Sequence, residues 1–274
     1  MDPFLPPVKP RTTPTGGLVY EGISFSLPQG YRPLLLDLHL PEGTSGPVPV
    51  VVWIHGGAFW SGDRRYLPDT VAPGAVFEAL LEAGIAVATI DYRLSGEARF
   101  PAQLDDVQAA LAYLRTFADT LGLDLSRLGI WGESAGATLA ALAALSSEGV
   151  SAAVLWYPAT DLTAMAPENP DGPIGRLLGG ASAQLPESAV QASPLTQVSE
   201  AAPPFLLLHG TADKQLPPRH SESLHAKLLE AGARSTYLPV PDAGHCFVGC
   251  PDVPALIDTS VAFLAQELTA GALD

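Results

Sequence analysis

The sequence of 274 residues has few cations, few cysteines and no long apolar run. No apolar stretch approaches the roughly 20 residues that a membrane-spanning helix needs, which argues against a membrane-embedded protein. Lysine and arginine number only 14 against 29 aspartate and glutamate residues, and the formal net charge is −15. An acidic chain repels phosphate backbones and anionic lipid surfaces, so neither nucleic acid nor a membrane is an expected partner.

The two cysteines, Cys246 and Cys250, lie four positions apart, and no second pair with metal-ligand spacing accompanies them. A zinc site is therefore not expected, and both thiols are expected to be free. Residues 1–16 contain several prolines and lack the charged and apolar regions of a signal peptide, so we expect an extended N-terminal arm. These features predict a cytoplasmic protein.

Strand-like and helix-like segments alternate along most of the chain, of which 47% is hydrophobic and only 16% charged. This composition is typical of a folded domain, and the alternation predicts one α/β domain over residues 1–274. Its sheet should be mostly parallel, with helices on both faces. The strand-like segments are residues 33–40, which look half-exposed, and residues 48–54, 85–90, 127–131, 152–157, 204–209 and 235–240; the helix-like segments are residues 73–83, 102–119, 135–146, 219–231 and 254–269.

Residues 161–200 interrupt this alternation with five prolines and four glycines. An irregular stretch of this length inside a compact domain is usually a functional lid or a binding loop, so we expect a short cap insertion here. The apolar residues of this segment are few and scattered, whereas a lid for long acyl chains needs a continuous apolar helix face. The segment therefore favours short acyl groups as substrates.

Residues 132–136 read Gly-Glu-Ser-Ala-Gly, between an apolar strand-like segment and a helix-like segment of small residues. This strand–turn–helix context is that of a nucleophile elbow, in which a strained turn exposes a serine hydroxyl above the start of a helix. Glycine is expected at positions 132 and 136 because a side chain there would clash within the tight turn. Ser134 is therefore the predicted nucleophile.

A serine nucleophile needs a base that removes its proton. His245 lies in a loop just after the last strand-like segment, where the base of an elbow enzyme is found. His220 and His225 fall on a predicted amphipathic helix, so we expect them to be solvated. His209 ends a buried strand and lies too close to the expected acid. His245 is therefore the predicted base.

The base in turn needs a carboxylate that orients its ring. Asp213 follows the strand-like segment 204–209 and is the predicted acid. Asp161, which follows the preceding strand-like segment, is the alternative. Asp242 is only three residues before the histidine and is interpreted as a turn residue.

Backbone N–H groups should stabilise the oxyanion of the tetrahedral intermediate. Ala135, the residue after the nucleophile, should supply one of them. The others should come from residues 55–59, which read His-Gly-Gly-Ala-Phe and form a glycine-rich bend after an early strand. Four aromatic residues flank these motifs and are candidates for the substrate pocket, with core packing as the alternative for each: Phe59, Trp60, Trp131 and Phe247.

Together these motifs resemble those of the α/β-hydrolase carboxylesterases, in particular the hormone-sensitive-lipase-like and feruloyl-esterase-like branch. The similar stretches are residues 55–59, 61–63, 91–94, 132–136, 209–213 and 244–245, in the order of that family. The resemblance implies an α/β-hydrolase fold that needs no metal or organic cofactor, with the amides of Gly57 and Ala58 in the oxyanion hole. Relatives similar to kynurenine formamidases leave open whether Gly56 rather than Ala58 donates.

The sequence thus predicts a serine carboxylesterase that hydrolyses short-chain or aryl esters of small molecules through an acyl-enzyme on Ser134. An amidase or arylformamidase with the same three residues is the first alternative. A non-catalytic binding protein of this fold is the second, although all three predicted catalytic residues are present. The physiological ester, the stereochemical preference and the formation of a homodimer are left open.

Overall fold

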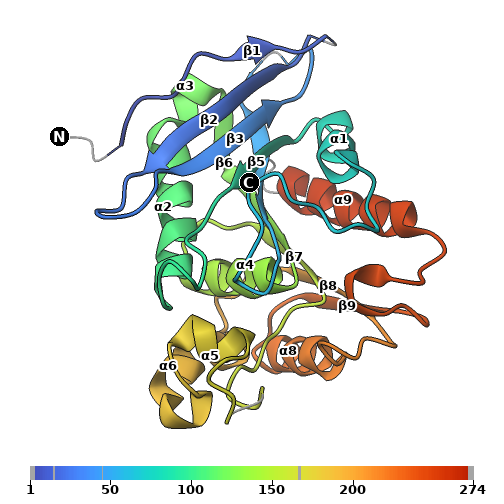
Figure 1. The fold of residues 1–274 in the computed structure, drawn as a ribbon. Coiled ribbons are helices and arrows are strands. Elements are labelled where there is room, and N and C mark those ends of the chain that lie inside the picture. Colours follow the sequence, from blue (N-terminus) through green and yellow to red (C-terminus); the bar gives the residue numbers. More distant parts are fainter. Residues whose placement is uncertain (1–3, 15, 45, 166–167, 271–274) are drawn as a thin grey trace.

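The computed structural model describes residues 4–14, 16–44, 46–165 and 168–270. The strands in these residues are β1 (Arg11–Thr12), β2 (Leu18–Ser26), β3 (Leu34–Leu40), β4 (Val48–Ile54), β5 (Ala86–Ile90), β6 (Leu123–Glu133), β7 (Ala152–Trp156), β8 (Phe205–Gly210) and β9 (Ser235–Val240). They form one sheet in the order β1-β2-β3-β5-β4-β6-β7-β8-β9 (Figure 1). The pairs β1–β2, β2–β3 and β3–β5 are antiparallel, whereas the remaining pairs, β5–β4, β4–β6, β6–β7, β7–β8 and β8–β9, are parallel. The predicted mostly parallel sheet is confirmed.

Helices cover both faces of the sheet, as predicted. The longer ones are α1 (Ala75–Glu82), α2 (Ala102–Thr116), α4 (Ala135–Ser146), α8 (Arg219–Glu230) and α9 (Val253–Ala270), with the short α3 (Ala118–Leu121) after α2 and the short η2 (His245–Phe247) after β9. Apolar residues of α2, α4 and α8 pack in the core on one face, and those of α1 and α9 pack on the other (Figure 1). The sheet is therefore covered by an apolar core on both sides.

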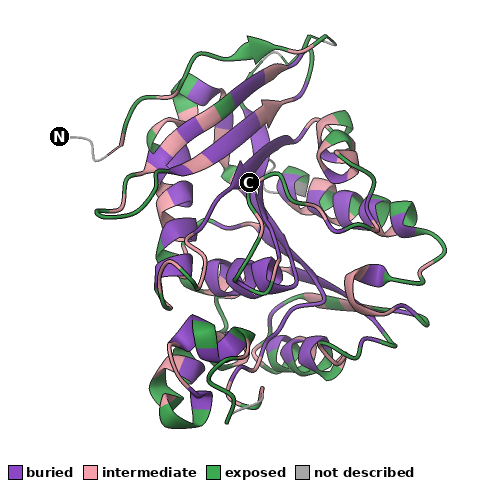
Figure 2. Ribbon diagram, in the orientation of Figure 1, coloured by how far each residue is buried: buried purple, intermediate pink, exposed green. Residues whose placement is uncertain are grey.

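The strand β4 shows why the centre of the sheet is stable. All seven of its residues are buried, and successive side chains point to opposite faces. Val50 and Val52 enter the core under α2 and α4, whereas Val51 and Trp53 enter the core under α1 and α9. Figure 2 shows the central strands buried along their length. This packing fixes the strand ends that carry the functional residues.

The predicted N-terminal arm, residues 1–16, contributes β1, which pairs antiparallel with β2. Residues 1–3 and 15 of this segment lie outside the described residues. The strand β2 was not among the predicted strands. Its register is interrupted between Tyr20 and Ile23, where Gly22 has a φ of 70° and donates its N–H to Asp37. The bulge breaks the alternation of apolar and polar residues by which a strand is recognised.

The segment 161–200 joins β7 to β8 and contains four short helices rather than irregular chain alone. They are α5 (Pro173–Leu178), η1 (Ser182–Gln184), α6 (Pro186–Gln191) and α7 (Pro194–Gln197). Three of them begin with proline, whose missing N–H and fixed φ suit the first position of a helix. Residues 166–167 of the segment are outside the described residues. None of these helices exceeds six residues, so within the described residues the segment presents no extended apolar helix face.

Candidate active site

Ser134 occupies a sharp turn between β6 and α4, with a φ of 52° and a ψ of −119°. This positive φ is strained for a residue with a side chain. The turn is tight enough that a Cβ atom on Gly132 would lie 2.3 Å from the carbonyl oxygen of Gly136, and a Cβ atom on Gly136 would lie 2.1 Å from that of Ile54. The predicted need for glycine at both positions is therefore confirmed by the backbone geometry.

Three side chains predicted from separate motifs meet at the carboxyl ends of the strands. The Oγ atom of Ser134 lies 3.0 Å from Nε2 of His245, in the η2 turn after β9. The Nδ1 atom of the same ring lies 2.7 Å from Oδ2 of Asp213, which follows β8. An aromatic wall is supplied by Tyr157, whose ring meets the imidazole edge to face at 4.9 Å. The arrangement is a hydrogen-bonded relay from a carboxylate to a hydroxyl group.

The side chain of Asp213 is fully buried, and burial alone would raise its pKa. Hydrogen bonds from the side chains of His209 and His245 and from the amide of Leu216 outweigh that effect and hold the pKa well below its usual range. The carboxyl group is therefore ionised at neutral pH and can orient a neutral imidazole or stabilise a charged one.

His209 is a part of this site that the sequence reasoning missed. Its Nε2 atom lies 2.7 Å from the carbonyl oxygen of Leu216 and 3.4 Å from Oδ2 of Asp213, and its Nδ1 atom contacts the hydroxyl group of Ser221. The ring therefore braces the loop that carries Asp213. Its position at the end of β8, four residues before the acid, was the available signal.

The structure also places two neighbouring residues. Asp161, the alternative acid, accepts hydrogen bonds from the amide and the hydroxyl group of Thr163, whereas the imidazole of His245 is hydrogen-bonded to Asp213. His220 was expected to be solvated, and that prediction was wrong because only 4% of the residue is exposed. Its Nδ1 atom accepts hydrogen bonds from the amides of Thr160 and Asp161, which turns the ring inward from α8.

The glycine-rich bend lies beside the nucleophile. Gly57 has a φ of 98°, and a Cβ atom there would lie 2.1 Å from the carbonyl oxygen of Ser61, so only glycine fits the turn. Ala58 follows with a φ of 56°. Ala58 and Ala135 line, together with Ser134, a cavity of about 220 Å³. Two of the three residues predicted as oxyanion donors, Ala58 and Ala135, therefore border one small pocket with the nucleophile.

A buried carboxyl group supports this bend from below. A Cβ atom on Gly56 would lie 2.0 Å from Oε1 of Glu133, so the bend rests directly on that carboxyl group. Burial raises the pKa of Glu133 to about 7, against the opposing effects of the Gly56 amide, the charge of His245 and the hydroxyl group of Tyr157. The Gly56 amide therefore interacts with the carboxyl group of Glu133.

Tyr92 holds the bend from the other side and was also missed as a functional residue. Its hydroxyl group donates to the carbonyl oxygens of His55 and Gly56 at 3.0 and 3.2 Å. The rings of Tyr92 and His55 stack at a centroid distance of 4.3 Å. Burial lowers the pKa of His55 to about 4, so this ring is neutral. The tyrosine within residues 91–94 was the signal for this support.

Only one of the four aromatic candidates lines the pocket. Phe59 is in its wall. Trp60 is 50% exposed, stacks under the guanidinium group of Arg176 at 4.4 Å and borders a different hollow. Trp131 and Phe247 were wrong as pocket residues, since both are fully buried on the α9 side of the sheet. There the indole of Trp131 packs edge to face against Trp156 at 5.0 Å, which is core packing.

Metal ligands, membrane-spanning helices and reactive cysteines were also considered for the described residues. Among them, no group of three or more His, Cys, Asp or Glu residues is placed to hold a metal ion. No helix in the described part of the chain has the length and apolarity to cross a membrane. Cys246 and Cys250 are free thiols, as expected. Burial raises the pKa of Cys246 to about 12, so its thiol is not a nucleophile at neutral pH.

The order of the sheet and the strand–turn–helix at Ser134 define the α/β-hydrolase fold. Residues 36–228 match the model of the family described as BD-FAE, and the chain belongs to that family. The chain is 32% identical to Esterase LipQ of Mycobacterium tuberculosis over 239 residues, which cover 80% of this chain and 55% of LipQ. It is also 32% identical to Esterase LipC of the same organism over 231 residues, which cover 73% of this chain and 53% of LipC. The chain thus spans about half the length of these curated relatives.

Solved structures share the whole fold. A truncated form of a carbohydrate esterase from gut microbiota matches with a TM-score of 0.83 and 27% identity, covering 95% of this chain and 100% of that chain. A bifunctional GH43-CE protein of Bacteroides eggerthii matches with a TM-score of 0.80 and 28% identity, covering 91% of this chain and 38% of that chain. The similarity therefore extends over both the sheet and the segment between β7 and β8.

Proposed function

We propose that this chain is a serine carboxylesterase that hydrolyses short-chain or aryl esters through an acyl-enzyme on Ser134. The observation that carries the proposal is the pair of hydrogen bonds, 3.0 Å from Ser134 to His245 and 2.7 Å from His245 to Asp213. A base and its orienting carboxylate within such distances are what an activated serine requires. The curated relatives named as esterases support the same activity.

In the first step, Nε2 of His245 takes the proton of the Ser134 hydroxyl group as Oγ attacks the ester carbonyl carbon. The carbonyl oxygen becomes an oxyanion, and the imidazolium is stabilised by the ionised carboxylate of Asp213. When the tetrahedral intermediate collapses, the C–O bond to the alcohol breaks and His245 gives its proton to the leaving oxygen. The product of this step is an acyl ester on Ser134.

In the second step, water replaces the alcohol. His245 takes a proton from the water, whose oxygen attacks the acyl carbon, and a second tetrahedral intermediate forms. Its collapse breaks the bond to Oγ, and His245 returns the proton to Ser134. The carboxylic acid leaves, and the hydrogen-bonded arrangement of the three residues is restored.

Backbone amides stabilise both oxyanions in this proposal. Ala135 donates from the first turn of α4, where the unpaired N–H groups and the helix dipole favour negative charge. Gly57 and Ala58 donate from the bend. The choice of Ala58 over Gly56 is supported by the buried Glu133, because the Gly56 amide faces its carboxyl group. Glu133 and Tyr92 thus act as positioning residues that hold the bend.

The proposed preference for short acyl groups is supported by the size of the pocket. Its volume is about 220 Å³, below the roughly 300–1,000 Å³ of typical pockets for drug-sized ligands. The apolar side chains of Phe59, Met165, Ile174 and Leu216 line it. Additional methylene groups gain binding energy only while apolar wall remains to bury them.

A fluorophosphonate probe tests the nucleophile. The native protein should be labelled on Ser134, and the Ser134→Ala variant should not. Turnover should be measured in parallel with p-nitrophenyl acetate, p-nitrophenyl butyrate and N-formylaniline. Hydrolysis of the two esters at far higher kcat/KM than the formamide supports an esterase, whereas the reverse order would support an arylformamidase. Labelling that persists in Ser134→Ala would refute the assignment.

A further inference from the structure

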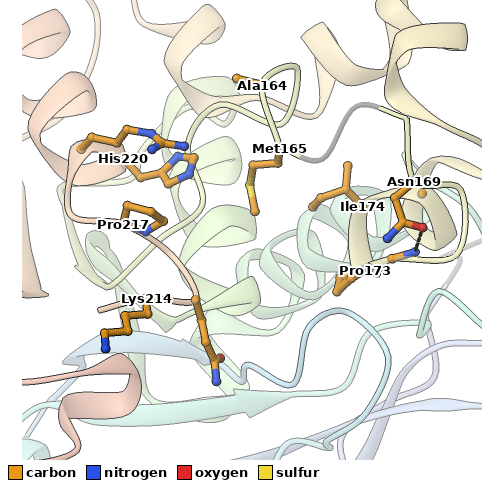
Figure 3. A pocket seen from close by; sticks show the side chains of 12 residues that line it. Ala164, Met165, Asn169, Pro173, Ile174, Lys214, Pro217 and His220 are labelled. Carbon is orange, nitrogen blue, oxygen red and sulfur yellow. Dashed lines mark hydrogen bonds between the residues drawn. The ribbon is translucent and has the colours of Figure 1, made fainter. Parts of the chain in front are cut away.

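A second cavity of about 310 Å³ adjoins the active-site pocket. Met165, Pro173, Ile174 and Gln215 line both spaces, so they form the partition between them. In Figure 3, His220 and Pro217 lie on one side of the second cavity, Pro173 and Ile174 lie on the other, and Met165 projects between them. The two spaces are therefore adjacent, so a group on a bound ester that passes Met165 would enter the second cavity.

The lining of the second cavity has an unusual charge for this protein. Lys214 and Arg219 line it, and among the described residues no aspartate or glutamate does. The whole chain carries 29 acidic residues against 14 basic ones, so a cavity lined by two cations stands out, although Asp161 lines a neighbouring hollow together with Arg219. Within the described residues, neither side chain forms an ion pair, although ten other cationic or histidine side chains do. These two charges are available to a ligand.

His220 adds a buried hydrogen-bond donor to the same lining. Its Nδ1 atom accepts from the amides of Thr160 and Asp161, so the proton of the neutral ring is on Nε2. Burial and the neighbouring Arg219 lower the pKa of His220 to about 4, which keeps the ring neutral. The residue is only 4% exposed, and Nε2 has no hydrogen-bond partner within the described residues. A buried donor without an acceptor is costly, and a bound ligand oxygen would relieve that cost.

We propose that this cavity is a subsite for a carboxylate carried by the ester substrate, held by the Nε2–H group of His220 and by the cations of Lys214 and Arg219. The proposal rests on the proposed esterase function and specifies its substrate class. The ester reacts at Ser134, an apolar spacer passes Met165 and Ile174, and the carboxylate lies beyond them. The preferred substrates are therefore half-esters of dicarboxylic acids or esters of hydroxy acids, rather than neutral esters.

Two matched pairs of substrates separate the acyl side from the alcohol side. The acyl pair is the p-nitrophenyl half-ester of adipic acid and the same ester of adipamic acid, which replaces the carboxylate by a neutral amide of similar shape. The alcohol pair is m-acetoxybenzoate and m-acetoxybenzamide. In at least one pair, the anionic member should have a kcat/KM several-fold above that of its amide near neutral pH. Equal or lower values for the anion in both pairs would overturn the proposal.

Variants of the lining residues test whether a preference for the anionic substrate arises from the second cavity. Arg219→Gln and Lys214→Gln alter exposed side chains and should each lower the anion-to-amide ratio of kcat/KM by about threefold to tenfold. His220→Asn can keep an acceptor for the amides of Thr160 and Asp161 near the position of Nδ1 but has no group at the position of Nε2, so it should lower the same ratio. Lys227→Gln removes one positive charge elsewhere on α8 and is the matched control. A ratio that falls as much in Lys227→Gln as in Arg219→Gln would show a general charge effect and overturn the subsite.

A binding measurement keeps the subsite testable if no ester is turned over. The Ser134→Ala protein with ¹⁵N-labelled histidine is titrated with adipate and, separately, with adipamide. The Nε2–H resonance of His220, identified by its loss in His220→Asn, should shift saturably with adipate and not with adipamide. A saturable shift without turnover would refute the esterase proposal alone. No shift with adipate would refute the carboxylate subsite, whatever the kinetics.

Discussion

The carboxyl group of Glu133 is buried directly beneath the glycine-rich bend, and this placement has a measurable effect on stability. Burial raises its pKa from the ordinary value of 4.5 to about 7 in the folded protein. A raised pKa means that the folded state binds this proton more tightly than the unfolded state does. Folding therefore takes up a proton between these two pH values.

The free energy of unfolding should consequently fall as the pH rises from about 4.5 to about 7 and then stay level with respect to this group. One unit of pKa difference between folded and unfolded states corresponds to about 1.4 kcal/mol, so the full effect is about 3 kcal/mol. Glu133→Gln keeps the shape and an acceptor for the Gly56 amide but does not ionise. The stability of this variant relative to the native protein should rise by about 3 kcal/mol across the same interval.

Urea unfolding at several pH values, followed by tryptophan fluorescence and circular dichroism together, measures this difference. Glu200→Gln, a change at an exposed carboxylate, is the matched control and should differ from the native protein by a constant amount. A pH-independent difference between Glu133→Gln and the native protein would show that Glu133 has the same pKa in the folded and unfolded states. The account of a raised pKa caused by burial beneath the bend would then be wrong.

Three further outcomes follow from the site. Asp213→Asn should lower kcat by about 10³–10⁴-fold, because loss of the orienting carboxylate is similarly costly in serine proteases. Asp161→Asn should change kcat less than about threefold, because the Asp161 carboxyl group is hydrogen-bonded to Thr163. If steady-state kinetics with p-nitrophenyl butyrate gave the reverse order, the acid would be the residue after the earlier strand. Among p-nitrophenyl esters, kcat/KM should peak between acetate and hexanoate and fall beyond octanoate, and a maximum at dodecanoate would contradict the small pocket. Tyr92→Phe removes the hydroxyl donor from the carbonyl oxygens of His55 and Gly56, of which only that of Gly56 keeps a contact with Nδ1 of His55. The variant should lower the free energy of unfolding by about 1–3 kcal/mol, with a lower kcat but little change in KM; unchanged kinetics would separate the tyrosine from the bend.

Local sequence could predict the parts of the site that consist of short motifs at strand ends. Gly132 and Gly57 are required by clashes within their own turns, whereas side chains at Gly136 and Gly56 would each clash with the other motif. The positions of Asp213 and His245 followed from the order of strands, because parallel strands end at one edge of the sheet. Each residue could therefore be proposed without knowing the full three-dimensional packing.

Other features depended on contacts between distant segments, and the placement of Trp131 was missed although the local alternation of side chains carried it. His220 lies on an amphipathic helix, but the amides that hold its ring inward belong to residues 160–161. Trp131 precedes the nucleophile closely in sequence, yet the alternation of side chains along β6 sends it to the opposite face of the sheet. The same alternation could have excluded it, since Ser134 and Trp131 lie three positions apart across a sharp turn. The strand β2 was not predicted because the unpaired residues of the bulge at Gly22 shift its apolar pattern.

The segment between β7 and β8 is also a crossover connection between two parallel strands. These two strands are parallel neighbours, and such strands must be joined by a chain that returns along one face, usually as a single helix. In the neighbouring units, α4 makes this return between β6 and β7, and α8 makes it between β8 and β9. Here a string of short helices replaces that single helix, and two of its residues, Met165 and Ile174, form walls of both cavities. In the proposed function, the residues that select the substrate therefore lie in a connection whose length the sheet does not determine. This connection can be lengthened or exchanged while the strands that carry Ser134, Asp213 and His245 keep their register.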